Sequence, residues 1–239
     1  LARGLDGDQS DRIRAALAAG RVTQLFLEPE AIRTSPQAGG APGTTLAAQL
    51  LGFVNRDGAG QYGVEQRYQD VLSGAPKIVI AQRDARSRVI PETAQVIASG
   101  VPGADVRLTI DAGLQLALEQ ELLAAWVADK PRTVSAVVMD PRTGEIYASA
   151  TYPSYDANNY GATDASRFLD PVISTVYEPG SVMKVLTTLA GLETRTITLD
   201  TQFNDIGIMR LDGGKTEIAD ADRKAKGWLT VRDGIAQSR

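Results

Sequence analysis

The chain has 239 residues, of which 43% are hydrophobic and 23% charged, and its net charge is −4. This composition is typical of a globular protein with room for one large domain or two of ordinary size. The absence of Cys and His excludes thiol nucleophiles, disulfides, a Ser-His-Asp triad and zinc sites built on Cys or His. Any nucleophilic chemistry must therefore use Lys, a carboxylate or Tyr as its base.

Other absences limit the partners that the sequence predicts. No run of basic residues stands out, so no nucleic-acid partner is expected. No stretch approaches the ~18 apolar residues of a membrane span, and no signal peptide opens the chain. We interpret the chain as a fragment at both ends, and we expect any export signal or membrane anchor to precede Leu1.

The first hundred residues predict a mixture of short elements. Residues 1–20 have the spacing of an amphipathic helix, and the Gly- and Pro-rich residues 34–44 are expected to be flexible. The pattern then predicts a helix over Val64–Leu72, a strand over 77–82 and turns over 83–91. A boundary is expected near residues 101–105, where Pro and Gly interrupt the pattern.

Clearer signals follow this boundary. RLTI (107–110) predicts a short strand, and Asp111 is placed to cap a helix. That helix would present one apolar face, made of Leu114, Leu118, Leu122 and Ala125. Residues 134–151 predict a hairpin whose turn suits a left-handed Gly144.

The last third of the chain predicts further mixed elements. A second helix is expected to begin near Ser181, and residues 228–238 (WLTVRDGIAQS) have a helix-like pattern. Lys215 and Thr216 are expected in a solvated loop, while Trp126 and Trp228 are expected to be packing residues. Strands and helices are mixed without regular βαβ alternation, which favours an α+β fold.

The strongest candidate for chemistry is the segment YEPGSVMK (177–184). Helix positions three apart share a face, so Lys184 is expected beside Ser181. An amine desolvated by apolar neighbours has a lowered pKa and can take the hydroxyl proton, while the helix N-terminus stabilises an oxyanion. Taken alone, the spacing favours a plainer interpretation, in which a helix-capping Ser precedes a solvated Lys.

The segment resembles the nucleophile motif of class B penicillin-binding proteins, a family with S-x-x-K, S-x-N and K-T-G motifs. The likeness continues, in the family's order, over LLGFVNRDGAGQYGVEQRY (50–68), RDARSRVIP (83–91), LTIDAGLQ (108–115) and AVVMDPRTGEIYASATYPSYDANNY (136–160), and it is weakest over residues 1–30. The resemblance implies a partial N-terminal pedestal domain of the dimerisation type over 1–105. The N-terminal part of a transpeptidase domain, an antiparallel sheet flanked by helices, would follow over 106–239.

By this resemblance Ser181 is the nucleophile, acylated by the D-Ala-D-Ala end of a peptidoglycan stem peptide, and Lys184 is its base. Ser238 is predicted to be the serine of S-x-N, relaying a proton to the leaving group; the alternative is an ordinary helix-surface Ser. The motif's Asn would follow Arg239. Lys215-Thr216 is rejected as K-T-G because that motif follows S-x-N in the family and Glu217 occupies its third place. We therefore expect the fragment alone to be inactive.

The resemblance also implies ligands, partners and a location. Stem peptides and β-lactam antibiotics would bind at Ser181, with a membrane-embedded glycosyltransferase and divisome or elongasome proteins as partners. The protein would act at the extracytoplasmic face of the bacterial membrane, in cell division or cell shape, without a cofactor or metal. Two alternatives stay open: a non-catalytic scaffold of a cell-wall synthesis complex, and a β-lactam sensor or β-lactamase sharing S-x-x-K. The pedestal-like region argues against the second.

Overall fold

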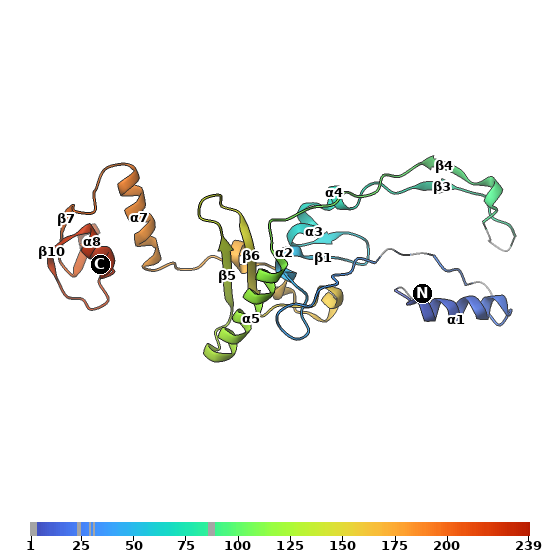
Figure 1. Ribbon diagram of the computed structural model, residues 1–239, viewed down its shortest axis with the longest axis horizontal. Helices are drawn as coiled ribbons and strands as arrows, with labels where there is room; N and C mark the ends of the chain where they lie inside the picture. Colours follow the sequence, from blue (N-terminus) through green and yellow to red (C-terminus); the bar gives the residue numbers. More distant parts are fainter. Residues whose placement is uncertain (1–3, 23–24, 29, 31, 86–88) are drawn as a thin grey trace. The chain divides into compact units, whose positions relative to one another are not determined.

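The computed structural model describes residues 4–22, 25–28, 30, 32–85 and 89–239 (Figure 1). Two compact units make up the chain, Leu1–Thr175 and Val176–Arg239, and each is described by itself. Helices and antiparallel strand pairs are mixed in the described residues, which confirms the α+β prediction. The predicted domains, 1–105 and 106–239, are a different division of the chain and stay a prediction.

The helix expected near the N-terminus is α1 (Gly7–Ala18). Asp6 begins it with a capping box: its carboxylate accepts from the Gln9 N–H at 2.7 Å, and the Gln9 side chain accepts from the Asp6 N–H at 3.2 Å. These bonds satisfy two backbone donors that a helix start would otherwise leave free. No residue of α1 is buried, so the capping box and the local sequence, and not tertiary packing, define this helix.

Short elements follow over residues 48–72. Helix α2 (Ala48–Leu51) precedes β1 (Phe53–Val54), which pairs antiparallel with β2 (Gly60–Gln61). The helix predicted over Val64–Leu72 is confirmed as two short pieces, α3 (Gly63–Arg67) and α4 (Gln69–Leu72), which join at Tyr68.

The hydrophobic core of the first unit joins two distant parts of the sequence. Phe53 stacks on Tyr160 with ring centroids 4.2 Å apart, and it meets Phe168 edge-on at 4.9 Å. The Tyr155 hydroxyl donates to the Ala48 carbonyl at 2.9 Å, and burial raises the pKa of this phenol. Aromatic pairs of this kind contribute about 0.5–1.5 kcal/mol each beyond their buried area. The partners come from α2 and β1, from the short helix η2 (Ala157–Ala162), and from residues that flank η2 and the short helix η3 (Ala165–Arg167).

The predicted strand at 77–82 is confirmed as β3 (Ile78–Ile80), which pairs antiparallel with β4 (Gln95–Ala98). The two strands run side by side as a ribbon in Figure 1, with η1 (Pro91–Thr93) beside them. Part of the turn-rich prediction, residues 86–88, lies outside the described residues.

Helix α5 (Ala112–Asp129) packs along the hairpin of β5 (Val134–Met139) and β6 (Ile146–Tyr152), as Figure 1 shows. Asp111 caps it as predicted, its carboxylate accepting from the Leu114 N–H at 2.8 Å, and Gly144 has the predicted left-handed φ of 78°. The predicted strand at 107–110 is wrong. Thr109 contacts β6 through its hydroxyl, which donates to the Ile146 carbonyl at 2.6 Å, and no ladder of backbone bonds forms there.

The buried face of α5 is more polar than the sequence predicts. Gln115 is 0% exposed, whereas Leu114, which was expected in the apolar face, is 38% exposed. The Gln115 side chain accepts from the Ser149 N–H and donates to the Ser149 carbonyl, both at 2.9 Å, which fastens α5 to β6. Burial of an amide costs free energy unless it is hydrogen-bonded, and here both its oxygen and its nitrogen have partners.

Glu119, one turn further along α5, anchors the Gly- and Pro-rich loop. Its carboxylate accepts from the N–H groups of Gly40 and Ala47, both at 2.7 Å, and from the Gln115 amide at 2.9 Å. Residues 34–44 were expected to be flexible, but this end of the loop is fixed by a buried carboxylate. A β-bridge between Ala38 and Thr45 closes the same loop.

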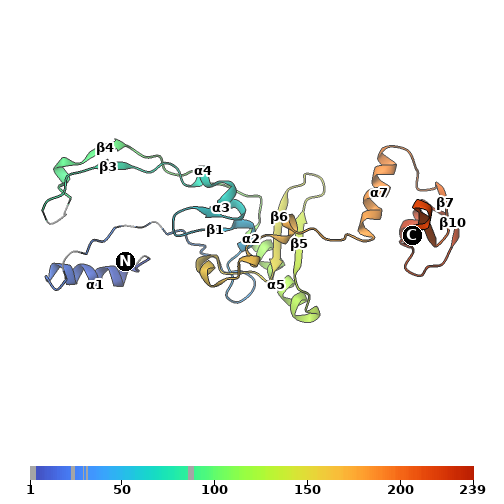
Figure 2. The ribbon, with the colours of Figure 1, turned by 180° about the vertical axis from the view of Figure 1, so that it is seen from behind.

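The second unit combines a long helix with two strand pairs and a shorter helix. Helix α7 (Val182–Glu193) precedes β7 (Gln202–Asp205), which pairs antiparallel with β10 (Gly227–Thr230). Between them β8 (Ile208–Leu211) pairs with β9 (Thr216–Ala219) around η4 (Asp212–Gly214), and α8 (Val231–Ala236) follows β10. Figure 1 shows α8 beside β10 near the C-terminus, and Figure 2 shows β7 and β10 there from behind.

Three predictions in this part of the chain are wrong in whole or in part. The solvated loop expected at Lys215 and Thr216 is wrong for Thr216, which begins β9, although the strand is exposed. The helix-like pattern of 228–238 holds only from Val231, because Trp228 and Leu229 pair with β7. Trp228 is 70% exposed and so does not pack as expected, whereas Trp126 does pack, meeting Tyr152 edge-on at 5.2 Å.

Replacing Glu119 tests how strongly its carboxylate anchors the loop. Glu119→Gln places an amide donor against backbone N–H donors, so we expect the free energy of unfolding to fall by about 1–3 kcal/mol. Urea unfolding of the purified protein measures this change. Glu121→Gln, an exposed substitution on the same helix, is the matched control and should change stability little. Equal effects of the two substitutions would contradict the anchoring role.

Candidate active site

Ser181 lies at the start of α7, as predicted. Gly180 has a left-handed φ of 57°, which turns the chain into the helix, and Ser181 is the N-cap residue with φ −63° and ψ −13°. The Ser181 side chain makes no capping hydrogen bond, and the residue is exposed. Its hydroxyl is therefore not used to cap α7, which removes the main support for the plainer interpretation of this serine.

Ser181 and Ser238 meet although 57 residues separate them. The Ser238 hydroxyl donates to the Ser181 Oγ, and the two oxygens are 2.9 Å apart. The distance is within the ordinary range for a hydrogen bond between hydroxyls. The structure thus places the two predicted serines in direct contact, and Ser238 is not an isolated surface residue.

Lys184 reaches Ser181 through Ser238. Its Nζ donates to the Ser238 carbonyl at 2.5 Å and lies 3.5 Å from the Ser238 Oγ. Among the described residues, the hydrogen bonds of Lys184 Nζ go to Ser238 and not to Ser181. The sequence predicted a direct Ser181–Lys184 pair; the structure instead gives a row of three groups with Ser238 in the middle.

The apolar neighbours expected to cover Lys184 are exposed within this unit. Val185 and Leu186, which follow it on α7, have half or more of their surface accessible. The predicted desolvation by these side chains is therefore not seen in residues 176–239. What holds the Lys184 ammonium in place is the Ser238 carbonyl.

Ser238 has a backbone conformation that fixes both of its polar groups. Its φ of 56° is left-handed, and it lies just after the end of α8. The Arg239 N–H donates to the Gly234 carbonyl at 2.8 Å, and the Ser238 N–H donates to the Ile235 carbonyl at 3.1 Å. These are the two bonds of a Schellman motif, in which glycine is the usual left-handed residue. A serine here is strained, and such strain persists only where the surroundings hold it.

Arg239, next to Ser238, is surrounded by three carboxylates. Its guanidinium forms two parallel bonds to Asp222, at 2.8 and 2.9 Å, and lies 3.2 Å from Asp220 and 3.5 Å from Asp205. The Arg239 side chain is only 6% exposed, and that of Asp205 is 3% exposed. We call these four residues the Arg239 cluster.

The charges of the Arg239 cluster shift one another's pKa values. The bond from Arg239 lowers the pKa of Asp222 to about 2, and the Lys224 N–H, which also donates to this carboxylate, acts in the same direction. The same contact with Asp222 raises the pKa of Arg239. Asp222 and Arg239 are therefore both ionised at neutral pH.

The sequence did not reveal the Arg239 cluster. Asp205 ends β7, Asp220 and Asp222 follow β9, and Arg239 follows α8, so only the folded chain brings them together. Their one sequence signal is the acidic run IADAD (218–222), which looks like an ordinary solvated turn.

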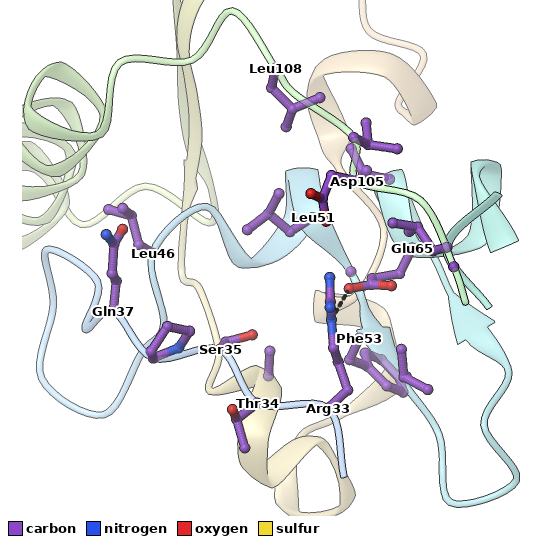
Figure 3. Close-up of a pocket in the computed structure, with 18 of the residues that line it drawn as sticks. Arg33, Thr34, Ser35, Gln37, Leu46, Leu51, Phe53, Glu65, Asp105 and Leu108 are labelled. Atoms are coloured by element: carbon purple, nitrogen blue, oxygen red, sulfur yellow. Dashed lines mark hydrogen bonds and ion pairs between the residues drawn. The ribbon is translucent and has the colours of Figure 1, made fainter. Parts of the chain in front are cut away.

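A separate pocket lies in the first unit, as Figure 3 shows. It has a volume of about 650 Å³, and Arg33 crosses one side of it to form an ion pair with Glu65 at 2.8 Å. Phe53, Leu51 and Asp105 also line it. None of the predicted site residues belongs to this pocket.

Within the described residues, no group of three or more His, Cys, Asp or Glu is arranged to hold a metal ion. A search of the same residues for helices long and apolar enough to cross a membrane finds none.

Comparison with known proteins identifies relatives along most of the chain. Residues 134–239 match the family described as the penicillin binding protein transpeptidase domain. Stage V sporulation protein D of Bacillus subtilis is 34% identical over 177 residues, and peptidoglycan D,D-transpeptidase FtsI of Escherichia coli is 31% identical over 230 residues. These alignments cover 73% and 96% of this chain, but only 27% and 37% of the relatives.

A solved structure shares the fold along nearly the whole chain. Penicillin binding protein 2X from Streptococcus thermophilus superposes with a TM-score of 0.71 over 98% of this chain and 35% of its own, at 22% identity. The chain thus spans about a third of the length of such proteins.

Acidification tests the Arg239 cluster. The pKa of Asp222 is about 2 in the folded chain against 3.8 ordinarily, so its ionised form stabilises the fold above about pH 4. This stabilisation should be lost as the pH falls from about 4 towards 2, and Asp222→Asn should lack that part of the pH dependence. Unfolding followed by circular dichroism across this window measures it. Asp200→Asn, at an exposed position, is the control and should behave as the wild type does.

Proposed function

We propose, since the chain belongs to the class B penicillin-binding protein family, that it carries the nucleophile of a serine-type peptidoglycan D,D-transpeptidase. Homologues named as peptidoglycan D,D-transpeptidases support the reaction class. The observation that carries the proposal is the contact of Ser181, Ser238 and Lys184, since it supplies a nucleophile and a proton path in a chain without His.

In the acylation step, the Ser181 Oγ attacks the carbonyl carbon of the penultimate D-Ala of a stem peptide. Its proton passes to the Ser238 Oγ while the Ser238 proton passes to the Lys184 Nζ, which acts as the base after losing the proton of its ammonium form. The hydroxyls must also rotate, because in the structure Ser238 donates to Ser181. The tetrahedral intermediate then expels the terminal D-Ala, whose amine takes a proton back through Ser238. An ester between Ser181 and the shortened peptide remains.

In the second step, an amine of a neighbouring stem peptide attacks this ester. The new amide is the cross-link, the ester bond to Ser181 breaks, and Oγ regains a proton by the same path. Free N–H groups at the start of α7 would stabilise the oxyanion in both steps. A β-lactam would acylate Ser181 in the same way, because its strained amide resembles the dipeptide, but its ring opens without releasing a leaving group.

This function implies a cellular location and partner proteins. Stem peptides lie outside the cytoplasm, so we propose that the protein acts at the extracytoplasmic face of the bacterial membrane, anchored by a segment other than the residues described. A membrane-embedded glycosyltransferase and proteins of the division or elongation machinery are the partners that such a reaction needs, because cross-linking follows glycan synthesis.

Two other functions make different predictions. A non-catalytic scaffold would keep its role in cells after Ser181→Ala, whereas a transpeptidase would lose it. A β-lactamase would hydrolyse its acyl-enzyme and release the opened β-lactam, so no lasting adduct would form. A sensor would keep the adduct but would not act on stem peptides. The Ser181 hydroxyl does not cap α7 and instead contacts Ser238, which favours catalysis over the scaffold.

Intact mass spectrometry before and after incubation with benzylpenicillin tests the proposal. The polypeptide should span the full length of the curated relatives, because this chain covers about a third of them. We expect one penicilloyl group, mapped to the peptide that contains Ser181, and no adduct on Ser181→Ala. Ser174→Ala is a control that leaves the candidate site intact. A wild-type protein that folds but gains no mass would overturn the transpeptidase proposal.

A pair of substitutions at Ser238 separates its chemistry from its backbone. Ser238→Gly and Ser238→Ala both remove the hydroxyl, and we expect each to slow acylation by about 10²–10⁴-fold. Their stabilities should differ, because glycine adopts the left-handed conformation without strain and alanine does not. We expect the Gly variant to be more stable than the Ala variant by about 1 kcal/mol. If the acylation rates of the two variants differed in proportion to their stabilities, the result would contradict a role for the hydroxyl.

A further inference from the structure

We infer that Arg239 is a positioning residue for acylation, because the Arg239 cluster holds the left-handed turn that aims the Ser238 hydroxyl at Ser181. The inference rests on the proposed function, since it assigns Arg239 a part in chemistry at Ser181. It concerns the position between the serine and the expected asparagine of the S-x-N motif.

Arg239 has the most buried side chain of the arginines that form ion pairs in residues 176–239. All of its nitrogens contact carboxylates, and the two bonds to Asp222 are parallel and short. The remaining arginines with ion pairs in residues 176–239 have more than half of the side chain exposed: Arg210, Arg223 and Arg232. Exposed pairs contribute little to a fixed geometry, whereas a buried guanidinium held in a bidentate pair has one arrangement, although the Asp222 side chain itself is 42% exposed.

The carboxylates are themselves fixed by backbone groups. Asp205 accepts from the Gly207 N–H at 2.8 Å and from the Lys226 N–H at 3.2 Å. Asp222 accepts from the Lys224 N–H at 3.1 Å. The Arg239 cluster is therefore attached to the end of β7 and to the turn before β10, so that the guanidinium ties the end of α8 to these segments.

Three elements thus converge on Ser238. The Schellman bonds of α8 hold its backbone, the Arg239 side chain holds the following residue, and the Lys184 ammonium binds its carbonyl. The left-handed φ of 56° would relax if one of these were lost, because a serine gains from leaving that conformation. A rotation at this residue moves the Oγ away from Ser181, and a displacement of about 1 Å can cost on the order of 100-fold in rate.

A purely stabilising role makes a different prediction for Arg239→Lys. Lysine keeps the positive charge that Asp205 and Asp220 need, but it lacks the planar fork that fixes Asp222. If Arg239 serves stability alone, its loss should act independently of the Ser238 hydroxyl, and the effects of the two substitutions should add. If it acts through Ser238, the effects cannot add, because a residue without a hydroxyl has nothing left to position.

The experiment is a double-mutant cycle in the full-length polypeptide. Wild type, Arg239→Lys, Ser238→Gly and the double variant are compared for the acylation rate constant and the noncovalent dissociation constant of a fluorescent penicillin. We expect Arg239→Lys to lower the rate constant by about 10–100-fold with little change in the dissociation constant. In the Ser238→Gly background it should cause almost no further loss. Arg223→Lys, at an exposed ion pair, is the matched control and should change neither constant.

Each outcome decides the inference. Additive losses, or an unchanged rate constant in Arg239→Lys, would overturn it while leaving acylation at Ser181 in place. If Arg239→Lys does not fold, Asp222→Asn removes only the bidentate partner, and it should give the same non-additive loss. A wild-type protein that fails to acquire the penicillin on Ser181 would instead overturn the proposed function, and the inference with it.

Discussion

One buried guanidinium among three carboxylates is the interaction on which the geometry of residues 176–239 depends. The strand pairs of this unit have few buried side chains and most of α7 is exposed, so the apolar packing of α8 is limited and centres on the Phe203 ring against Gly234. A buried ion group is a weak source of net stability, because desolvation offsets much of the attraction. The ion group matters here because it fixes the geometry of the residues around it. The fork of Arg239 accepts one arrangement of Asp222, and that arrangement fixes the residue beside it.

The first unit uses a buried carboxylate in a different way. Glu119 accepts hydrogen bonds from backbone N–H groups and an amide, and within the part of the chain that the structure describes it holds the loop without an ion pair. In both units a short polar contact decides where an otherwise irregular segment lies. The aromatic core around Phe53 is the hydrophobic cluster of this unit, and it too joins residues more than a hundred positions apart.

Local features were predictable from the sequence because their causes are local. Asp111 caps α5 through a residue three positions away, Gly144 meets the demand of one turn, and Ser181 begins a helix after Gly180. Several of the failures depend on distant partners. The apolar pattern of RLTI has no partner strand, WLT pairs with β7 instead of extending α8, and α5 buries Gln115 because Ser149 offers it both a donor and an acceptor. No sequence pattern near Arg239 predicts its contact with Asp205.

The choice of residue at position 238 brings these arguments together. A Schellman turn is best served by glycine, and a proton relay needs a hydroxyl, so the two demands conflict at one position. Serine meets the second demand at the cost of backbone strain, and the same left-handed backbone places its carbonyl against Lys184 while its Oγ meets Ser181. In a chain without His, the proposed base Lys184 lies on the same helix as the proposed nucleophile Ser181, and its hydrogen bonds connect it to Ser181 through Ser238. The strain at Ser238 is therefore part of how the site is built, and the Arg239 cluster is what keeps it in place.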